Sequence, residues 1–290
     1  MSSLRWKIAG HVLALVATVL IGGLLSATLV RLAPGFDADE RELDPHLSAE
    51  SVRALHDARR QDHNVFRFYF SYMKRAMTGD LGTSLALAQP VRALLRDRAP
   101  LTMRLLAIGL GLAWMLTLTL ALSAAWLRLS VYDTLTTTVS GTFLCIPAAV
   151  LALLSVLWNA PGALAIALIV FPHTYRYSRN LLVKAYSKPH IITARAKGLG
   201  EARILFWHVA PVVAPQLLAV VGVSVSMAVG AAIPVEALCG LAGIGQLAWQ
   251  AALARDLPLL VNITVLVTLV TLLANSSADV IGHVVRSQKA

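Results

Sequence analysis

The chain has 290 residues, of which 57% are hydrophobic and only 14% are charged. Soluble domains are typically about 45 to 50% apolar, so this composition excludes an ordinary soluble domain and indicates a membrane protein with several spans. The net charge of +10 does not indicate nucleic-acid binding, because residues 33–100 hold ten basic and ten acidic side chains and the excess lies mostly at the ends of apolar stretches. We therefore expect no nucleic acid among the partners.

Six stretches reach the length of about 20 apolar residues that a spanning helix requires. In chain order they run from about Ile8 to Leu32, Leu101 to Leu127, Tyr132 to Trp158, Gly162 to Val183, Pro211 to Ile233 and Leu257 to Val285. Pro147 interrupts the third stretch and Pro172 lies inside the fourth. The pattern predicts an all-α polytopic membrane protein with about six transmembrane helices.

The charges of the short loops predict how the spans are oriented. Residues 1–32 are interpreted as a retained N-terminal transmembrane helix. The charge-neutral residues 33–100 form the long loop that follows, in which Ser48 can cap an amphipathic helix. Residues 101–290 hold the other five spans. Lysines and arginines gather in the short loops and at both termini on one face, which the positive-inside rule assigns to the cytoplasm.

Residues 187–211, between the fourth and fifth spans, form one compact cationic segment. Ser187 is predicted to cap a short helix with Pro189 in its first turn, and Gly198 to end that helix in the left-handed conformation. A second short helix from Gly200 to about His208 would lead to Pro211, which opens the fifth span. The segment is either an ordinary loop whose charges fix orientation or a docking helix for a soluble partner.

Two carboxylates mark the outer side. Glu236 ends an apolar span beside Gly243 and Gly245, where it is either an anchor or gate element of the outer loop or an interfacial charge that reaches water. Asp256 is interpreted as a cap that opens the sixth span. The two cysteines and the scattered histidines lack metal-ligand spacing, and no hydrolase or nucleotide-binding motif is present. We expect no metal, no cofactor and no catalytic residue.

Several motifs, in order, resemble one family. Thr193-Ala194-Arg195-Ala196-Lys197-Gly198, followed by His208 and Pro211, is similar to the cytoplasmic coupling motif of ABC importer permeases, in the version of the dipeptide, oligopeptide and nickel branch. Further stretches resemble the same branch: Gly79-Asp80-Leu81-Gly82-Thr83-Ser84, Pro90-Val91, Pro100-Leu101-Thr102, Glu236-Ala237-Leu238, Gly243-Ile244-Gly245, Arg255-Asp256-Leu257-Pro258, and Asn275 with Asp279. The departures are Ile192 at the glutamate of the general motif, Val212, Ala242 and a C-terminus without D-P-R.

The resemblance implies the transmembrane subunit of a type I, binding-protein-dependent ABC importer that forms half of a pathway for di- or oligopeptides. Its partners would be a second homologous permease subunit, in a heterodimer, two ATP-binding subunits that hydrolyse ATP, an extracytoplasmic substrate-binding protein and membrane lipid. It would be a multi-pass protein of the bacterial inner membrane, with both termini cytoplasmic. The resemblance assigns ATPase coupling to eight positions: Thr193, Ala194, Arg195, Lys197, Gly198, Glu201, His208 and Pro211. It assigns the pathway or outer gate to four: Glu236, Gly243, Gly245 and Asp256.

Other transport functions remain open at this point. An importer permease for nickel or a metallophore complex, or a peptide-exporting ABC permease, would use the same frame. An ion-coupled secondary transporter would need paired carboxylates or symmetric broken helices within the membrane, and the predicted spans offer neither.

Overall fold

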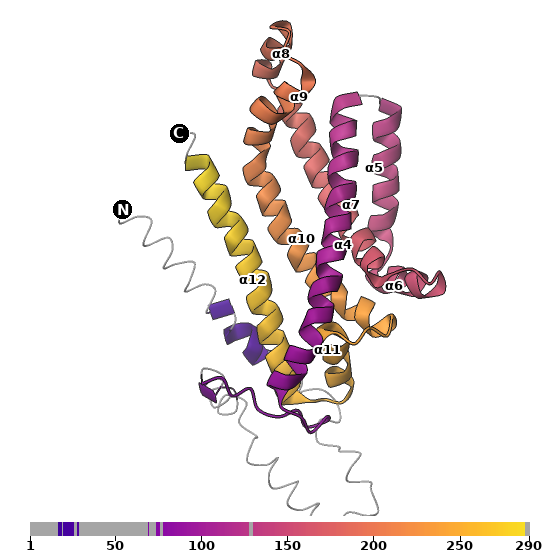
Figure 1. Ribbon diagram of the computed structural model, residues 1–290, viewed down its shortest axis with the longest axis vertical. Coiled ribbons are helices and arrows are strands. Elements are labelled where there is room, and N and C mark those ends of the chain that lie inside the picture. The colour runs from indigo at the N-terminus through magenta and orange to yellow at the C-terminus, as the bar shows by residue number, and fades with distance from the viewer. Residues whose placement is uncertain are drawn as a thin grey trace, which may run out of the picture. The chain divides into compact units, whose positions relative to one another are not determined.

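The computed structural model describes residues 17–18, 20–25, 28, 69, 74–75, 78–127 and 130–287, with side chains up to residue 282. Within these ranges the chain is helical, and its one strand-like feature is a bridge between Thr83 and Pro90. The helices (Figure 1) are α4 (Val91–Leu127), α5 (Ser130–Cys145), α6 (Ala148–Leu157), α7 (Gly162–Tyr186), α8 (Pro189–Ala196), α9 (Glu201–Ile204), α10 (Ala210–Leu238), α11 (Ile244–Leu253) and α12 (Leu257–Ser287). Most of the predicted first span and the predicted helix at Ser48 lie outside the described residues.

Three stretches of the described chain are helical, long and apolar enough to cross a membrane: Val91–Leu127, Glu201–Leu238 and Leu257–Gly282. A fourth is added if α5 and α6 count as one broken span. The prediction of an all-α polytopic membrane protein is confirmed. The predicted fourth span forms α7, but the second half of that helix is polar and carries Arg176, Arg179 and Lys184.

Prolines explain where the observed helices differ from the predicted spans. The predicted third span is not one helix, because α5 and α6 meet at an angle of 96° around Pro147. Proline disfavours helical backbone at the residue before it, so α5 stops before Pro147 and a new helix starts after it. The second span begins ten residues earlier than predicted, at Val91, with Pro100 inside the helix.

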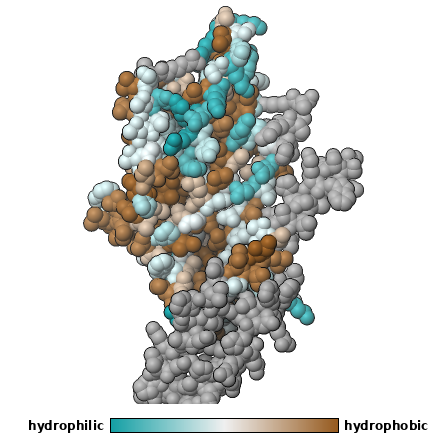
Figure 2. Space-filling view, turned by 180° about the vertical axis from the view of Figure 1, so that it is seen from behind, coloured by the Kyte–Doolittle hydropathy of each residue, from teal (hydrophilic) through white to brown (hydrophobic). Residues whose placement is uncertain are grey.

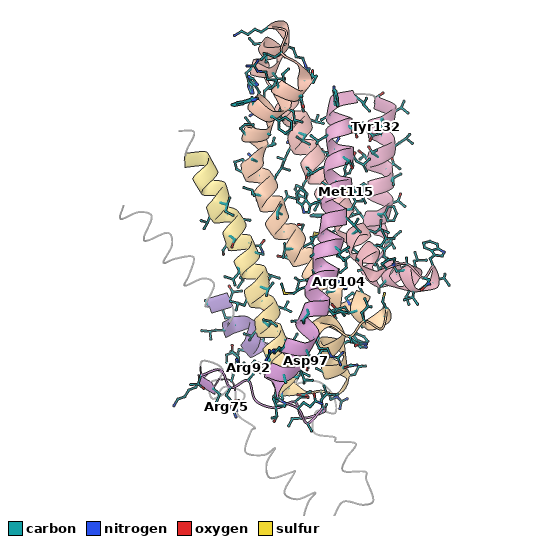
Figure 3. The ribbon with its side chains drawn as sticks, viewed as in Figure 1. Arg75, Arg92, Asp97, Arg104, Met115 and Tyr132 are labelled. Atoms are coloured by element: carbon teal, nitrogen blue, oxygen red, sulfur yellow. The ribbon has the colours of Figure 1, made fainter. Side chains whose placement is uncertain are left out.

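The described residues divide into two compact units. The first unit combines the described residues before Pro100 with Leu247–Leu269, and the second combines Pro100–Gln246 with the chain from Val270 onward. Figure 2 shows hydrophilic surface at the end of the second unit that carries α8 and α9, and apolar surface around its middle. Charged side chains also mark the first turns of α4, which is about 55 Å long at 1.5 Å per residue; Arg92, Asp97 and Arg104 are labelled in Figure 3.

Helix α7 lies at the centre of the second unit. Its first half is almost wholly buried, and Gly109 lets α4 approach closely, since a Cβ there would come within 2.8 Å of Ile166. Its second half is fixed by polar contacts: the Thr174 and Thr117 hydroxyls lie 2.7 Å apart, and Tyr175 donates to Thr136 on α5 over 2.7 Å. Such hydroxyl pairs join helices where the surroundings offer no water.

Helices α10 and α12 pack through small residues. A Cβ added at Gly222 would lie 3.0 Å from both the Ala278 Cβ and the Asn275 Oδ1. The Asn275 amide donates to Ser226 on α10 over 2.9 Å. Close approach at a glycine, next to one interhelical hydrogen bond, is a common way for membrane helices to associate.

A larger side chain at Gly222 should separate these helices. We expect Gly222→Leu to lower the free energy of unfolding by about 1–3 kcal/mol, the usual cost of overpacking. Gly230→Leu is the matched control, because Gly230 lies on the same helix with nothing within 4 Å of its Cβ position. Thermal unfolding in detergent measures both, and equal midpoints for the two variants would contradict the packing described here.

Candidate functional site

Helix α8 begins at Pro189 and presents its apolar side inward. Pro189 occupies the first turn, as predicted, where the missing N–H has no helical partner to lose. Ile191 and Ala194 are buried. The prediction that Ser187 caps this helix is wrong: Lys188 holds the N-cap position without a side-chain bond, and the Ser187 hydroxyl donates to the Lys184 carbonyl at the end of α7. The turn between α7 and α8 is too short to free Ser187 from the first helix.

Gly198 ends α8 in the predicted conformation, with φ +76°. Its N–H donates to the Arg195 carbonyl over 2.9 Å, and the Leu199 N–H donates to the Ala194 carbonyl over 3.2 Å. This pair of bonds is a Schellman motif, which satisfies the last carbonyls of a helix and requires a left-handed residue. The glycine therefore sets the direction in which the chain leaves α8.

Arg195 and Glu201 close the turn between α8 and α9. The Arg195 Nε donates to Glu201 Oε1 over 2.6 Å, and its second nitrogen donates to Oε2 over 3.1 Å. The guanidinium also lies over the Tyr186 ring, 5.9 Å from its centroid. The hydrogen bond to Glu201 raises the pKa of Arg195 above its ordinary value. Arg195 is therefore paired within the chain.

His208 and Pro211 lie in or beside a π-helical turn, Leu205–Val209, that joins α9 to α10. The helix is thus continuous from Glu201 to Leu238, and Pro211 lies in the first turn of its α10 part, where the fifth span was predicted to open. A proline inside a helix clashes with the carbonyl four residues earlier, here that of Trp207, and a widened turn makes room for the ring. The Nδ1 atom of His208 is buried, with no hydrogen-bond partner within the described chain.

The outward face of α8 is small and mostly uncharged. Ile192 is 62% exposed, and Thr193, Ala196 and Lys197 are exposed beside it. Ala194 does not belong to this face, because it packs into the core. Of the eight predicted coupling positions, Thr193 and Lys197 therefore lie on the surface of α8, and Gly198 shapes its end.

Glu236 is the centre of a buried cluster at the other end of α10. The side chain is 0% exposed, so the alternative that it reaches water is wrong. Its Oε2 accepts hydrogen bonds from the N–H groups of Gly245, over 2.6 Å, and Gln246, over 3.2 Å. These amides belong to the first turn of α11, where they lack helical partners, and a carboxylate is favourable at that helix end.

Thr102 completes the Glu236 cluster from α4. Its hydroxyl accepts from the Ile244 N–H over 2.8 Å and lies near the Glu236 carboxylate, since a Cβ at Gly243 would meet both groups within 2.5 Å. Glycines are required around the carboxylate: a Cβ at Gly243 would overlap it, and one at Gly245 would lie 2.7 Å from the Ala232 carbonyl oxygen. The structure thus brings Glu236, Gly243 and Gly245 together, as their motifs indicated, and adds Thr102.

Asp256 belongs to a second cluster, within the first unit. It is 1% exposed and caps α12, as predicted, because its Oδ1 accepts from the Leu259 N–H over 3.1 Å. Its Oδ2 accepts from the Ser84 hydroxyl over 2.5 Å and from the Ala86 N–H over 3.0 Å. The Asn262 amide adds a bond to the Leu81 carbonyl over 3.0 Å. The Gly79–Ser84 motif is therefore bound to the start of α12.

Three residues of these clusters were not assigned a role from the sequence: Thr102, Ser84 and Asn262. The sequence offered one signal for two of them: Thr102 lies in the P-x-T motif and Ser84 lies in the G-D-L-G-x-S motif. Their partners lie more than 130 residues away, a pairing that spacing alone does not predict. Within the described chain, no three His, Cys, Asp or Glu side chains lie close enough to hold a metal ion.

Amide hydrogen exchange can test the left-handed turn that follows α8. Gly198→Ala should cost about 1–2 kcal/mol locally, because a side chain is disfavoured at this φ, and should speed amide exchange across residues 187–204 about 5- to 30-fold. Gly200→Ala is the matched control, since Gly200 has an ordinary φ of −65° and an open Cβ position. Hydrogen exchange read by mass spectrometry would contradict the Schellman assignment if both variants exchanged alike.

The Glu236 cluster predicts an order of stabilities. Glu236→Ala removes the carboxylate that accepts from the Gly245 and Gln246 N–H groups, and the loss at the buried Gly245 amide should cost about 1–3 kcal/mol. Glu236→Gln keeps one acceptor oxygen and should unfold between the alanine variant and the wild type. Thermal unfolding in detergent gives the order, and an alanine variant as stable as the wild type would exclude a stabilising role for the cluster.

Comparison with known proteins places these features in a family. The family model described as binding-protein-dependent transport system inner membrane component matches residues 117–288, more than half of the chain. The chain is 29% identical over 275 residues to the oligopeptide transport system permease protein OppB of Escherichia coli K12, covering 87% of this chain and 88% of that protein. It is 28% identical over 276 residues to the protein of the same name from Haemophilus influenzae, covering 87% and 89%. The resemblance to ABC importer permeases is confirmed, and the chain belongs to the family of inner-membrane components of binding-protein-dependent transport systems.

Proposed function

We propose that this chain is the transmembrane subunit of an ATP-driven importer of di- or oligopeptides. It forms half of the pathway and couples to a separate ATPase through residues 187–211. Membership in the family supports transport across the inner membrane, and the relatives named as oligopeptide permeases favour peptides over nickel or a metallophore complex. ATP hydrolysis is assigned to partner subunits.

The observation that carries the coupling role is the outward face of α8. Ile192 on this face is 62% exposed, so an apolar side chain is available to a partner. Ile192 lies next to Thr193, Ala196 and Lys197, and none of these side chains is buried within the chain. Ala196 and Thr193 are small enough to let another protein approach the helix backbone closely. A partner that offers a shallow groove therefore fits this face better than a partner that offers a charged surface.

The continuous helix from Glu201 to Leu238 supports transmission of movement from that face. One end of the helix is joined to α8 by the Arg195–Glu201 ion pair. Its other end holds Glu236, about 50 Å away along 35 residues of helix. A displacement of α8 would therefore reach the Glu236 cluster through one continuous helix, and not through a chain of loops.

The remaining features of the proposal follow the family pattern. A second permease subunit in a heterodimer, two ATP-binding subunits and an extracytoplasmic binding protein would complete the transporter. Both termini and α8 would face the cytoplasm, while residues 33–100 and the Glu236 cluster would lie on the outer side. Residues 1–32 would form the N-terminal span and residues 101–290 the permease core.

Substitution at Ile192 tests the coupling role. We expect Ile192→Glu to abolish co-purification of the ATPase subunits, or to lower peptide-stimulated ATP hydrolysis at least about tenfold, because a carboxylate would be desolvated in the contact. Co-purification of the assembled transporter followed by an ATPase assay measures both effects.

His190→Glu is the matched control for this experiment. His190 is an exposed residue of the same helix, two positions from Ile192 and outside its face, and the change in charge is the same. The proposal is supported if the His190→Glu transporter assembles and hydrolyses ATP as the wild type does while the Ile192→Glu transporter does not. If both variants retain full stimulated activity, α8 is not the ATPase contact.

A further inference from the structure

The second half of α7 carries an exposed polar stripe that the fold of this chain does not use. We define the polar stripe as His173, Arg176, Tyr177 and Asn180. These positions follow the helical spacing of three and four residues and so share one face. Tyr177 is 56% exposed, Arg176 and Asn180 are exposed, and His173 is half-buried.

The opposite face of α7 is buried and fixed. Thr174, Tyr175 and Ser178 are all at most 1% exposed. Besides the bonds of Thr174 and Tyr175 described above, Ser140 on α5 donates to the Pro172 carbonyl over 3.1 Å, and Arg179 forms a bidentate ion pair with Asp133. The rotation of the helix about its axis is therefore set, and the polar stripe cannot turn into the core.

The position of the polar stripe makes lipid an unfavourable neighbour. Arg176 lies roughly 21 Å along α7 from Gly162 and about 15 Å before its end at Tyr186. The second half of α7 is the polar half of this helix, and arginine and histidine side chains on membrane-protein helices face water-filled cavities or partners, not acyl chains. Arg179 is neutralised by Asp133, but Arg176 has no carboxylate partner among the side chains that the structure describes.

The side chains of the polar stripe match the groups that all peptides share. Arginine binds carboxylates through two parallel hydrogen bonds, and every linear peptide ends in a carboxylate whatever its sequence. The Asn180 amide, held by a bond of 2.9 Å from Arg179, and the His173 and Tyr177 side chains can hydrogen-bond backbone amides. The His173 and Tyr177 rings also support each other, with centroids 5.1 Å apart.

We propose that the polar stripe lines the aqueous part of the translocation pathway and that Arg176 contacts the terminal carboxylate of the peptide in transit. This inference rests on the proposed function, because it takes a peptide as the substrate. It adds a residue that discriminates between substrates: peptides with a free carboxylate should move faster than the same peptides with an amidated C-terminus, and Arg176 should be the source of that difference.

Cysteine labelling tests whether the polar stripe faces water. In the assembled transporter in lipid nanodiscs, with Cys145 and Cys239 replaced by alanine, Tyr177→Cys should react with a hydrophilic maleimide. Val139→Cys on α5 is the matched control, being 52% exposed on an apolar helix surface, and should react at least about tenfold more slowly, since a thiol in lipid does not ionise. Equal slow reaction at both positions would overturn the aqueous assignment.

Transport into proteoliposomes tests the role of Arg176. We compare one tripeptide with its C-terminal amide. The wild type should favour the free carboxylate, and Arg176→Gln should reduce that preference at least about tenfold, as expected for loss of a charge-assisted bond. Arg176→Lys, which keeps the positive charge, should retain part of the preference for the free carboxylate. Arg104→Gln, which removes an exposed arginine from α4 (Figure 3), should leave the preference unchanged.

The outcomes separate this inference from the proposed function. If the wild type transports both peptides and Arg176→Gln retains the full preference for the carboxylate, the role of Arg176 is excluded and the proposed function stands. If the wild type transports neither peptide, the proposed function fails and the assignment of Arg176 fails with it. The labelling result then decides by itself whether the polar stripe faces water.

Discussion

The bond between the Glu236 carboxylate and the first amides of α11 is the interaction on which one end of the second unit depends. A carboxyl group that is 0% exposed is tolerated only with hydrogen-bond donors, and the start of a helix supplies N–H donors that lack a partner within the helix. Thr102 on α4 bonds the adjacent Ile244 N–H. The ends of α10 and α11 and one position of α4 are thereby joined by neighbouring hydrogen bonds, and a conformational change must move them together or break a buried bond.

At the opposite end of α10, polar contacts are placed differently. The Arg195–Glu201 pair is about one-third exposed, so it contributes little to stability and mainly fixes geometry. Together with the Schellman motif at Gly198, it orients α8 so that Ile192 points outward while Ile191 and Ala194 pack inward. The result is a rigid outer helix with an uncovered apolar side chain, attached to a long apolar helix.

Much of this arrangement could be predicted from the sequence where the cause is local. The all-α class, the left-handed Gly198 and the cap formed by Asp256 follow from composition and from residue types in a short window. The prediction that Ser187 caps the start of α8 was wrong because serine can also bond the last carbonyls of a preceding helix. In this structure Ser187 belongs to the end of α7. The bond from Ser84 to Asp256 and the bond from Ile244 to Thr102 join residues more than 130 positions apart, which spacing does not predict. Likewise, Pro147 marked a break in the third span, but the angle of 96° follows from packing.

The π-helical turn Leu205–Val209 has a geometric consequence for all of residues 187–211. Such a turn holds one residue more than an α-helical turn, and one residue corresponds to about 100° of rotation around a helix axis. The widened turn therefore sets the azimuth of α8 and α9 relative to α10. A chain with the same surface residues but a regular α-helical turn here would aim Ile192 in another direction, so the register upstream of Pro211 determines where the exposed face of α8 points.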